Sequence, residues 1–479
     1  MVPRFSACAG RPPVPSRVRL TAVRGLAIPS GVKPSVPDAE SRDAPYRPAA
    51  PQVAVVGIGE AGWDALTPAA RDALEGADLI IGGARHLDFL PDALRERSRL
   101  FPSPLGPFLD RLAGALRDGE ARSFDGAKRI AFLASGSPML YGIGSSLAER
   151  GLEGRFTVHP ALSTLALACA QLGWAESETV LVSACGRPLD ALSAELVDGG
   201  RVVVLSADET TPARAAALLR VRGFGASRIH VLEHLGGPLE RVHAHTAAAW
   251  PEGWACARLN ALAIALVADA DTPPLARFGL PDDAFEHDGQ ITKRDVRLSA
   301  LARLAPQPGA LLWDIGTGAG SVGIEWCLAA PRTRAIGVER DPMRAERARS
   351  NAARLGAVGY RVIEAEMPGG LETLLRAAPS RPDAIFVGGG ASVPGLLERL
   401  WSVLGPGGRL VAHGVTLETE RVLLEAQAAH GGELTRLQVS HASPVGRFTA
   451  MRPAMAVLQW SHVRRREGAA TSPDRPPEG

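Results

Sequence analysis

The segment Leu311-Leu-Trp-Asp-Ile-Gly-Thr-Gly-Ala-Gly320 carries the strongest structural signal in this chain. Its apolar part predicts a buried strand, and its three glycines let the backbone come close to a ligand before a helix begins at Ser321. Backbone N–H groups at such a helix start face the carboxyl end of the sheet. The order of strand, glycine loop and helix therefore predicts a cofactor site in an open α/β sheet.

The next predicted strand points to a cofactor that contains a ribose. It ends in Glu339, about 20 residues after the glycines, where an acid can bind a ribose diol. Nicotinamide-dependent oxidoreductases and methyltransferases that use S-adenosylmethionine (SAM) both have this pairing. The methyltransferase is favoured because the loop reads Gly-Thr-Gly-Ala-Gly with Asp314 two residues before it, and because SAM has no pyrophosphate for the helix N-terminus. Further strands of the same sheet are predicted within residues 361–366, 384–390 and 404–412.

Composition limits the class of protein and of partner. The chain has 479 residues, of which 46% are apolar and 22% charged, as in ordinary globular proteins with two or three folding units. Its 53 basic and 51 acidic residues give a formal net charge of +2, which argues against a nucleic-acid partner. The five cysteines are scattered without metal-ligand spacing, so we expect no metal and a cytoplasmic location. The longest uncharged stretches, 130–148 and 156–175, are too polar to span a membrane.

The chain is predicted to contain two α/β domains between two tails. Residues 51–272 form the first domain, which opens on a strand at 53–59 and closes on a strand at 261–267; 273–290 form a Pro-rich linker, and 291–462 form the second domain. Residues 1–50 hold nine prolines and no apolar period, and they are predicted to be disordered, like residues 463–479. The Arg-rich composition of 1–50 also fits a transit peptide, although an upstream start codon that adds a tail is the simpler interpretation.

Five segments of the second half agree in order with a known family. Together they resemble the decarboxylating precorrin methyltransferase domain of cobalamin biosynthesis. The segments are residues 291–297, 312–325, 338–342, 386–390 and 414–419. The resemblance covers about residues 280–460 and implies a Rossmann-like SAM methyltransferase fold. Residues 365–368 depart from the usual family pattern of Gly, acid, Ala and Pro. The residues expected at SAM are Thr292, Asp314, Gly316, Thr317, Gly318, Ala319, Gly320, Glu339 and Ala365.

Basic residues at the start of this domain are candidates for binding the substrate. Lys293, Arg294 and Arg297 could hold carboxylate side chains of a precorrin, because Arg pairs bidentately with carboxylates. The alternative is a solvated helix start. His413 follows the fifth strand, where it could face the macrocycle or be a structural histidine, and no catalytic acid or base is assigned.

The first half resembles a different family. Residues 130–144 predict an apolar strand, a Ser-Gly-Ser-Pro turn and a glycine-spaced helix start, similar to the SAM-holding loop of tetrapyrrole methylases, a fold of two α/β subdomains. Residues 160–164 and 182–187 match the next landmarks of the C5-methylating branch. The resemblance spans about residues 52–272 and implies that Arg187 binds the substrate. The residues expected at SAM are Gly57, Gly59, Ser135, Gly136, Ser137, Pro138, Ser163 and Thr164.

Two positions of the first half depart from the family pattern. Ser137 stands where the turn usually has Asp, and Cys185 stands where the family usually has His. Loss of a catalytic base is one interpretation of Cys185, and a plain wall residue is the simpler one. His230 and His234 are i, i+4 spaced but lack the Glu of a zinc motif, so no metal site is expected there.

Both resemblances together imply a fused enzyme similar to the family of precorrin-6B C5,15-methyltransferases (decarboxylating). The first domain would methylate C5, and the second would methylate C15 and remove the C12 acetate carboxyl as carbon dioxide, giving precorrin-8. We expect two SAM sites, a small-molecule precorrin substrate, no nucleic acid, no membrane and a homo-oligomer. One alternative is that only the second half is catalytic and the first is a degenerate binding partner. Another is a pair of SAM enzymes acting on a nucleic acid, which the near-neutral charge argues against.

Overall fold

The structure is a computed structural model in which residues 53–117, 124–272 and 277–464 are described. The predicted disordered tail 1–50 lies outside these ranges, as does 465–479. Val463, assigned to the second tail, instead ends strand β19 (Val457–Val463). Within the described residues, no helix combines the length and the apolar character needed to cross a bilayer.

The first sheet is fully parallel and has the strand order β3-β2-β4-β1-β5. Alternate residues of β4 face opposite sides: Phe132 packs with α4 and α5, whereas Leu133 packs with α1, α2 and α3. Both faces are therefore buried, which explains the unbroken apolar runs in the sequence. The elements are β1 (Val53–Ile58), α1 (Pro68–Glu75), β2 (Leu79–Gly82), α2 (Ala84–Asp88), α3 (Asp92–Arg95), β3 (Ser98–Leu100), α4 (Leu105–Arg117), β4 (Ile130–Ser135), α5 (Ile143–Ala148) and β5 (Thr157–His159), with a 3-10 turn at Trp63–Ala65.

The second sheet is mixed and has the order β6-β7-β10-β8-β9. Only β6 and β7 are parallel, and the predicted closing strand, β10, lies antiparallel between β7 and β8. This subdomain therefore differs from the fully parallel first sheet. Its elements are α6 (Thr164–Leu172), β6 (Thr179–Ser183), β7 (Arg201–Leu205), α7 (Thr211–Val221), β8 (Arg228–Glu233), β9 (Arg241–Thr246) and β10 (Asn260–Ala265), with 3-10 segments at Glu176–Glu178 and Leu189–Glu195.

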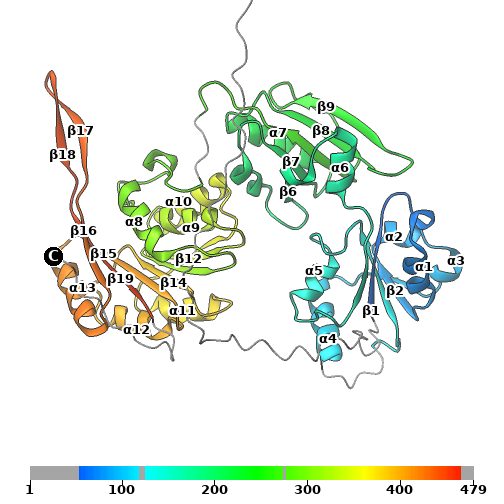
Figure 1. Ribbon diagram of the computed structural model, residues 1–479, viewed down its shortest axis with the longest axis horizontal. Coiled ribbons are helices and arrows are strands. Elements are labelled where there is room, and N and C mark those ends of the chain that lie inside the picture. Colours follow the sequence, from blue (N-terminus) through cyan, green and yellow to red (C-terminus); the bar gives the residue numbers. More distant parts are fainter. Residues whose placement is uncertain (1–52, 118–123, 273–276, 465–479) are drawn as a thin grey trace, which may run out of the picture. The chain divides into compact units, whose positions relative to one another are not determined.

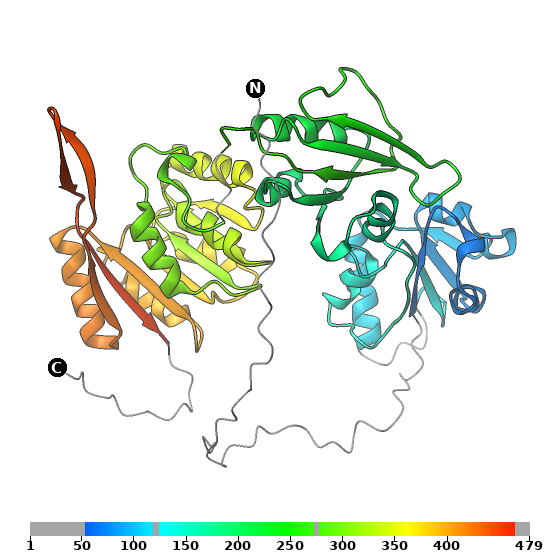
Figure 2. The same cartoon turned by 45° about the horizontal axis from the view of Figure 1, so that its top comes forward.

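The third sheet contains the five predicted strands of the second half in the order β13-β12-β11-β14-β15, followed by β19 and β16 (Figures 1 and 2). The first five strands are parallel, and the chain reverses direction across the sheet between β11 and β14. The elements are α8 (Arg294–Leu304), β11 (Leu311–Ile315), α9 (Ser321–Ala329), β12 (Arg334–Glu339), α10 (Pro342–Leu355), β13 (Tyr360–Glu364), α11 (Gly370–Ala377), β14 (Ala384–Val387), α12 (Leu396–Val403), β15 (Arg409–Gly414), α13 (Leu417–His430) and β16 (Glu433–Leu437).

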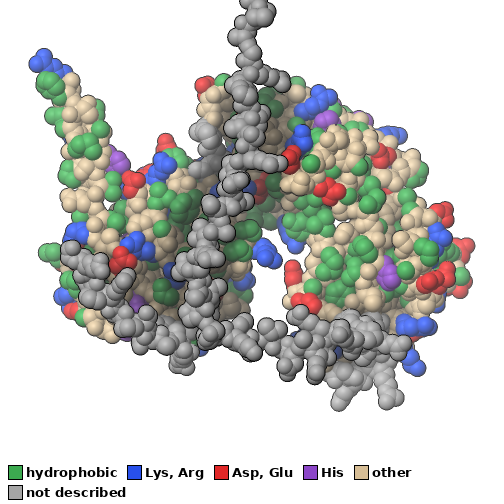
Figure 3. All heavy atoms as spheres, viewed as in Figure 1, with side chains coloured by type: hydrophobic (Ala, Val, Ile, Leu, Met, Phe, Trp, Pro, Cys, Tyr) green, Lys and Arg blue, Asp and Glu red, His purple; other side chains and the backbone are tan. Residues whose placement is uncertain are grey.

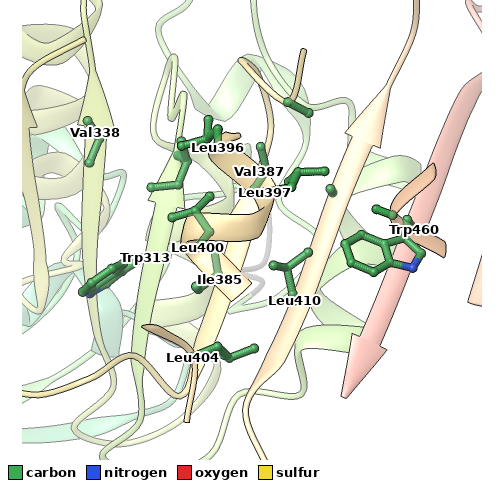
Figure 4. Close-up of a cluster of buried hydrophobic side chains, with 14 of the residues drawn as sticks. Trp313, Val338, Ile385, Val387, Leu396, Leu397, Leu400, Leu404, Leu410 and Trp460 are labelled. Carbon is green, nitrogen blue, oxygen red and sulfur yellow. The ribbon is translucent and has the colours of Figure 1, made fainter. Parts of the chain in front are cut away.

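Helices cover both faces of this sheet. Trp313 and Ile385 point to the side of α11, α12 and α13, whereas Leu312 and Phe386 point to the side of α8, α9 and α10. Figure 4 shows the first of these clusters, with Leu400 of α12 near Ile385 and Trp460 beside Leu410. The predicted doubly wound α/β fold of the second half is confirmed.

The predicted linker 273–290 needs correction. Residues 273–276 lie outside the described ranges, but Leu280 and Phe285 are buried among side chains of the second domain. The backbone N–H groups of Gly279 and Leu280 donate hydrogen bonds to the buried Glu325 carboxylate, at 2.8 and 2.9 Å. The second domain therefore begins before residue 291.

A two-stranded hairpin follows β16, and no sequence pattern predicted it. Strands β17 (Ser440–Val445) and β18 (Phe448–Pro453) pair only with each other among the described strands. Apolar side chains lie along this hairpin at the upper left of Figure 3, and basic side chains lie at its tip.

Candidate active sites

A cavity of about 1030 Å³ opens at the carboxyl ends of β11, β12, β13, β14 and β15. It lies where the strand order reverses, which is the usual ligand position in open α/β sheets. The residues predicted from the sequence that line it are Thr292, Lys293, Gly316, Thr317, Gly318, Glu339 and Ala365.

The glycine loop after β11 has a backbone that only glycine adopts easily. Gly316 and Gly318 have φ angles of +67° and +56°. A Cβ atom on Gly316 would lie 2.9 Å from the carbonyl oxygen of Gly389, in the loop that follows β14. The two loops therefore approach each other closely at the cavity wall, and they leave no room for a side chain at position 316.

Glu339 ends β12 and holds the glycine loop from the side. One carboxylate oxygen accepts a hydrogen bond from the N–H of Gly318 at 2.9 Å, and the other accepts from Arg340 and Asp341 at 3.0 and 3.1 Å. A carboxylate has about four acceptor positions, so Glu339 keeps capacity for about one ribose hydroxyl. The position of Glu339 at the cavity wall supports its predicted role in binding the ribose.

Asp314 lies beneath the loop and does not line the cavity. Its Oδ2 accepts hydrogen bonds from Thr317 Oγ1 at 2.5 Å and from the N–H of Gly323 at 3.1 Å, and Tyr360 OH lies 2.7 Å from Thr317 Oγ1. Desolvation by burial raises the pKa of Asp314 to about 6. The prediction that Asp314 touches the cofactor is corrected: it fixes the loop. Ala319 and Gly320 are also buried outside the cavity.

The structure corrects the interpretation of Arg297 as a substrate-binding residue. Its side chain is fully buried, and Nε donates to Glu325 Oε1 at 2.7 Å while Nη1 donates to the carbonyl oxygen of Thr292 at 2.6 Å. The guanidinium also bonds Asp282 and the carbonyl oxygen of Leu280. Its donors are occupied inside the fold, so Arg297 holds the start of the domain together.

The two other predicted basic residues differ in position. Lys293 lines the cavity and lies 3.6 Å from Asp282. Arg294 is exposed on α8 and is not part of the cavity wall. Of the predicted cluster, the structure therefore brings only Lys293 to the site.

Several cavity residues were missed by sequence reasoning. Two of them lie in segments 338–342 and 386–390, which were not assigned to a site residue by residue, and the other four carry no local motif. They are Arg340, Arg344, Gly389, Ser392, His441 and Met455. His413, which the sequence left undecided, also lines the cavity.

In the first half, the loop after β4 has the same steric requirement as the loop after β11. Gly136 has a φ of +56°, and a Cβ atom there would lie 2.8 Å from the carbonyl oxygen of Leu162. A Cβ atom on Gly57 would overlap the carbonyl oxygen of Gly136, so Gly57 serves this close packing. Gly59 has open space around its Cα.

Ser135 lies in a cluster of polar side chains that no motif predicted. Its Oγ accepts a hydrogen bond from Arg85 at 2.9 Å and lies 2.9 Å from His86 Nε2. Arg85 also pairs with Glu60, whose other oxygen lies 3.0 Å from His234 Nδ1. Desolvation lowers the pKa of His86 to about 4, so this ring is neutral near pH 7.

The remaining predicted residues of the first half have local contacts. Ser163 caps α6 by accepting a hydrogen bond from the N–H of Ala166 at 3.0 Å, and Thr164 begins that helix. Ser137 is partly buried and Pro138 is buried in the turn. The Arg187 guanidinium lies 4.8 Å from the centre of the Tyr141 ring. Partial burial raises the pKa of the Cys185 thiol.

The two halves of the chain match two different family models. The chain matches the family model of "Tetrapyrrole (Corrin/Porphyrin) Methylases" over residues 52–250 and that of the "Precorrin methyltransferase domain" over residues 283–464. It is 43% identical over 413 residues to a Sinorhizobium protein named "Precorrin-6Y C(5,15)-methyltransferase [decarboxylating]", covering 86% of this chain and 96% of that protein.

Two shorter relatives each carry one of these activities in their names. The "Cobalt-precorrin-7 C(5)-methyltransferase" of Salmonella typhimurium is 36% identical over 191 residues, covering 40% of this chain and 88% of that protein. The "Probable cobalt-precorrin-6B C(15)-methyltransferase (decarboxylating)" of Pyrobaculum aerophilum is 31% identical over 185 residues, covering 38% of this chain and 93% of that protein.

The two folds and their glycine loops define a fused pair of methyltransferase domains, a class that uses SAM as methyl donor. The chain belongs to the family of decarboxylating precorrin-6Y C(5,15)-methyltransferases.

Proposed function

We propose that this protein methylates a precorrin at C5 and C15 and removes the C12 acetate carboxyl, with one SAM site in each half. The names of relatives give the substrate as precorrin-6Y or cobalt-precorrin-6B. We expect the product to be precorrin-8. The observation that carries the proposal is that both halves end a central parallel strand in a loop with a glycine, Gly136 or Gly316, whose Cβ would meet a backbone carbonyl oxygen.

The residues of the second half are arranged to position a ligand. When bound, SAM supplies an electrophilic methyl group. Glu339 and the glycine loop orient the donor, whereas Lys293 and Arg340 place positive charge at the cavity for the substrate carboxylates. Holding two reactants in line can supply up to about 7–11 kcal/mol of a barrier, so positioning is the main task of this site.

The division of labour is tested with two fragments. The cut falls at 273–276, between ranges that each contain complete sheets, so 52–272 and 277–464 should fold separately. Fragment 277–464 should give a singly methylated, decarboxylated product from precorrin-6Y and SAM, as measured by mass spectrometry. A folded fragment without this product would contradict the proposal.

We infer that the second half acts first. The C15-methylating relative is named for cobalt-precorrin-6B and the C5-methylating relative for cobalt-precorrin-7, which supports this order. Fragment 52–272 should therefore leave precorrin-6Y unchanged and methylate the product of 277–464. Methylation of precorrin-6Y by 52–272 alone would reverse the order.

The degenerate-partner alternative concerns the first half alone. It is favoured by Ser137 in place of the usual acid and by the engagement of Ser135 with Arg85 and His86. Failure of fragment 52–272 to bind SAM at millimolar concentration would support it and withdraw the C5 activity.

We also expect a cytoplasmic homo-oligomer. Phe448 and Met451 of the β17–β18 hairpin are 67% and 64% exposed, and a second copy of the chain would cover such apolar side chains. Sedimentation should give more than one chain per particle, and Phe448→Asp should lower that number. A wild-type monomer would contradict the expectation.

A further inference from the structure

His413 lies at the end of the cavity away from Glu339. The order of strand ends along the sheet is β12 with Glu339, β11 with the glycine loop, β14 and then β15 with His413. Neighbouring strands are about 4.8 Å apart, so His413 is about 10 Å across the sheet from the glycine loop. A cofactor that uses Glu339 and the glycine loop leaves the β14–β15 side to the substrate.

The His413 ring is held in one orientation by a buried chain of hydrogen bonds. Its Nε2 lies 2.9 Å from Gln459 Oε1, and Gln459 Nε2 donates to Ser299 Oγ at 3.2 Å. Gln459 is fully buried, and the edge of the His413 ring meets the Phe386 ring at 5.0 Å between centres. Because an amide oxygen can only accept, Nε2 of His413 carries the hydrogen.

The other ring nitrogen is therefore a proton acceptor. No group of the described residues hydrogen-bonds to Nδ1 of His413, and the residue lines the cavity. Desolvation lowers the pKa of His413 to about 4, against the effect of the Gln459 hydrogen bond, so the ring is neutral near pH 7. A neutral imidazole with a fixed tautomer is suited to accept and return one proton.

The chemistry of the second half needs such a group. When a macrocycle carbon takes a methyl group from the sulfonium, the carbon–methyl bond forms, sulfur keeps the electron pair of the broken bond, and the macrocycle must lose one proton. When the carbon–carboxyl bond breaks, carbon dioxide leaves, its bonding electrons pass to the macrocycle, and the acetate methylene carbon must gain one proton. The two steps together conserve protons.

We propose that Nδ1 of His413 takes the proton released during methyl transfer and returns it to the carbon left by carbon dioxide. Gln459 is a positioning residue, because it fixes the tautomer through Nε2. The inference rests on the proposed function and adds to it the proton carrier that links methylation to decarboxylation.

The first test is His413→Asn in the full chain, which removes the basic nitrogen and keeps a polar side chain. The rate of carbon dioxide release at saturating substrate should fall about 10²- to 10⁴-fold, the usual contribution of a proton-transfer group. SAM affinity by calorimetry should stay within threefold of wild type, because His413 lies on the substrate side. In His413→Ala, added imidazole should restore part of the rate.

The second test moves the pKa without removing the ring. Gln459→Glu places a carboxylate at Nε2, stabilises the imidazolium and should shift the acidic limb of the pH–rate profile upward by at least one unit. The other charged or titratable groups on neighbouring elements are Lys293, Asp295, Glu420 and His441. The parts of the pH–rate profile that these groups control should not move. Long-range ¹H–¹⁵N spectra of the resting protein should show His413 protonated on Nε2 only near pH 7.

The control is His430→Asn, a histidine on α13 outside the cavity wall, which should leave the rate unchanged. A His413→Asn rate within threefold of wild type, no rescue by imidazole, or a hydrogen on Nδ1 would each overturn the inference. Failure of the proposed function is a separate result, because then the wild-type protein itself would release no carbon dioxide from precorrin-6Y.

Discussion

The glycine loops after β4 and β11 have the same steric restriction but different polar surroundings. At both, a Cβ atom would meet a backbone carbonyl oxygen, at 2.8 Å for Gly136 and 2.9 Å for Gly316. Around the second loop lie the buried carboxylates of Asp314 and Glu339, whereas Ser135 at the first loop contacts Arg85 and His86. SAM carries a sulfonium and an ammonium group. The backbone geometry is therefore shared between the two folds, and the charge around it is what we expect to set the two affinities apart.

The steric restriction at Gly136 can be tested directly. Gly136→Val should abolish SAM binding to the first half, because φ is positive there and the Cβ atom would overlap the carbonyl oxygen of Leu162. Calorimetry of the full chain should then show one site in place of two. Gly114→Ala, in the open middle of α4, is the control and should keep both sites. Two sites in Gly136→Val would show that the loop does not hold SAM.

The ion pairs of the two halves should differ in their contribution to stability. Arg297 and Glu325 are both fully buried, so Arg297→Ala leaves an unpaired buried charge and should lower the free energy of unfolding of the second half by about 3–5 kcal/mol. The Arg85 side chain, paired with Glu60, is 37% exposed, so Arg85→Ala should cost the first half about 1 kcal/mol or less. Urea denaturation with hydrogen exchange resolves the halves, and equal losses would refute the distinction.

We expect the free energy of unfolding of the second half to depend on pH through Asp314. The pKa of its carboxyl is about 6 in the fold and 3.8 as the reference value, so the folded state holds this proton more tightly. The free energy of unfolding should therefore decrease as pH rises from about 4 to about 6, by about 3 kcal/mol at most, and stay low above pH 6.

Asp314→Asn isolates this contribution. The variant should lack this part of the decrease, as measured by urea denaturation of wild type and variant at each pH. A difference between the two proteins that does not change from pH 4 to pH 7 would disprove the assignment.

The contribution of the Glu339 carboxylate to SAM binding in the second half can be measured. Glu339→Ala removes the acceptor for the loop N–H groups and for the ribose, and should weaken SAM binding to this half by about 1–3 kcal/mol. The first half should bind SAM as before, which serves as the internal control in the same titration. Unchanged affinity of the second site would remove Glu339 from the cofactor site.

A smaller change is expected at Ser137 in the first site. Ser137→Asp introduces the acid that the family usually has in this turn. A carboxylate pairs with a charged donor about twice as strongly as a neutral oxygen, so SAM binding to the first half should become equal or tighter, by about tenfold at most. Ser137→Ala is the matched control and should not tighten binding. Weaker binding by Ser137→Asp would mean that the turn faces SAM differently.

The strands that end at the glycine loops, the loops themselves and the acid at the end of β12 could be predicted from the sequence. These features are local, because a run of apolar residues followed by glycines with positive φ constrains its own backbone whatever lies around it. The same local signals gave the two resemblances, and from them the order of the two domains.

Which polar side chains reach the sites depends on contacts between distant elements of the fold. Arg297 and Lys293 lie in one basic cluster in the sequence, yet the first is buried against Glu325 and the second lines the cavity. His413 depends on Gln459 and Ser299, which come from β19 and α8, and Glu60 meets His234 from another sheet. The order of strands across a sheet brings such residues together, and that order depends on long-range packing that no local pattern encodes.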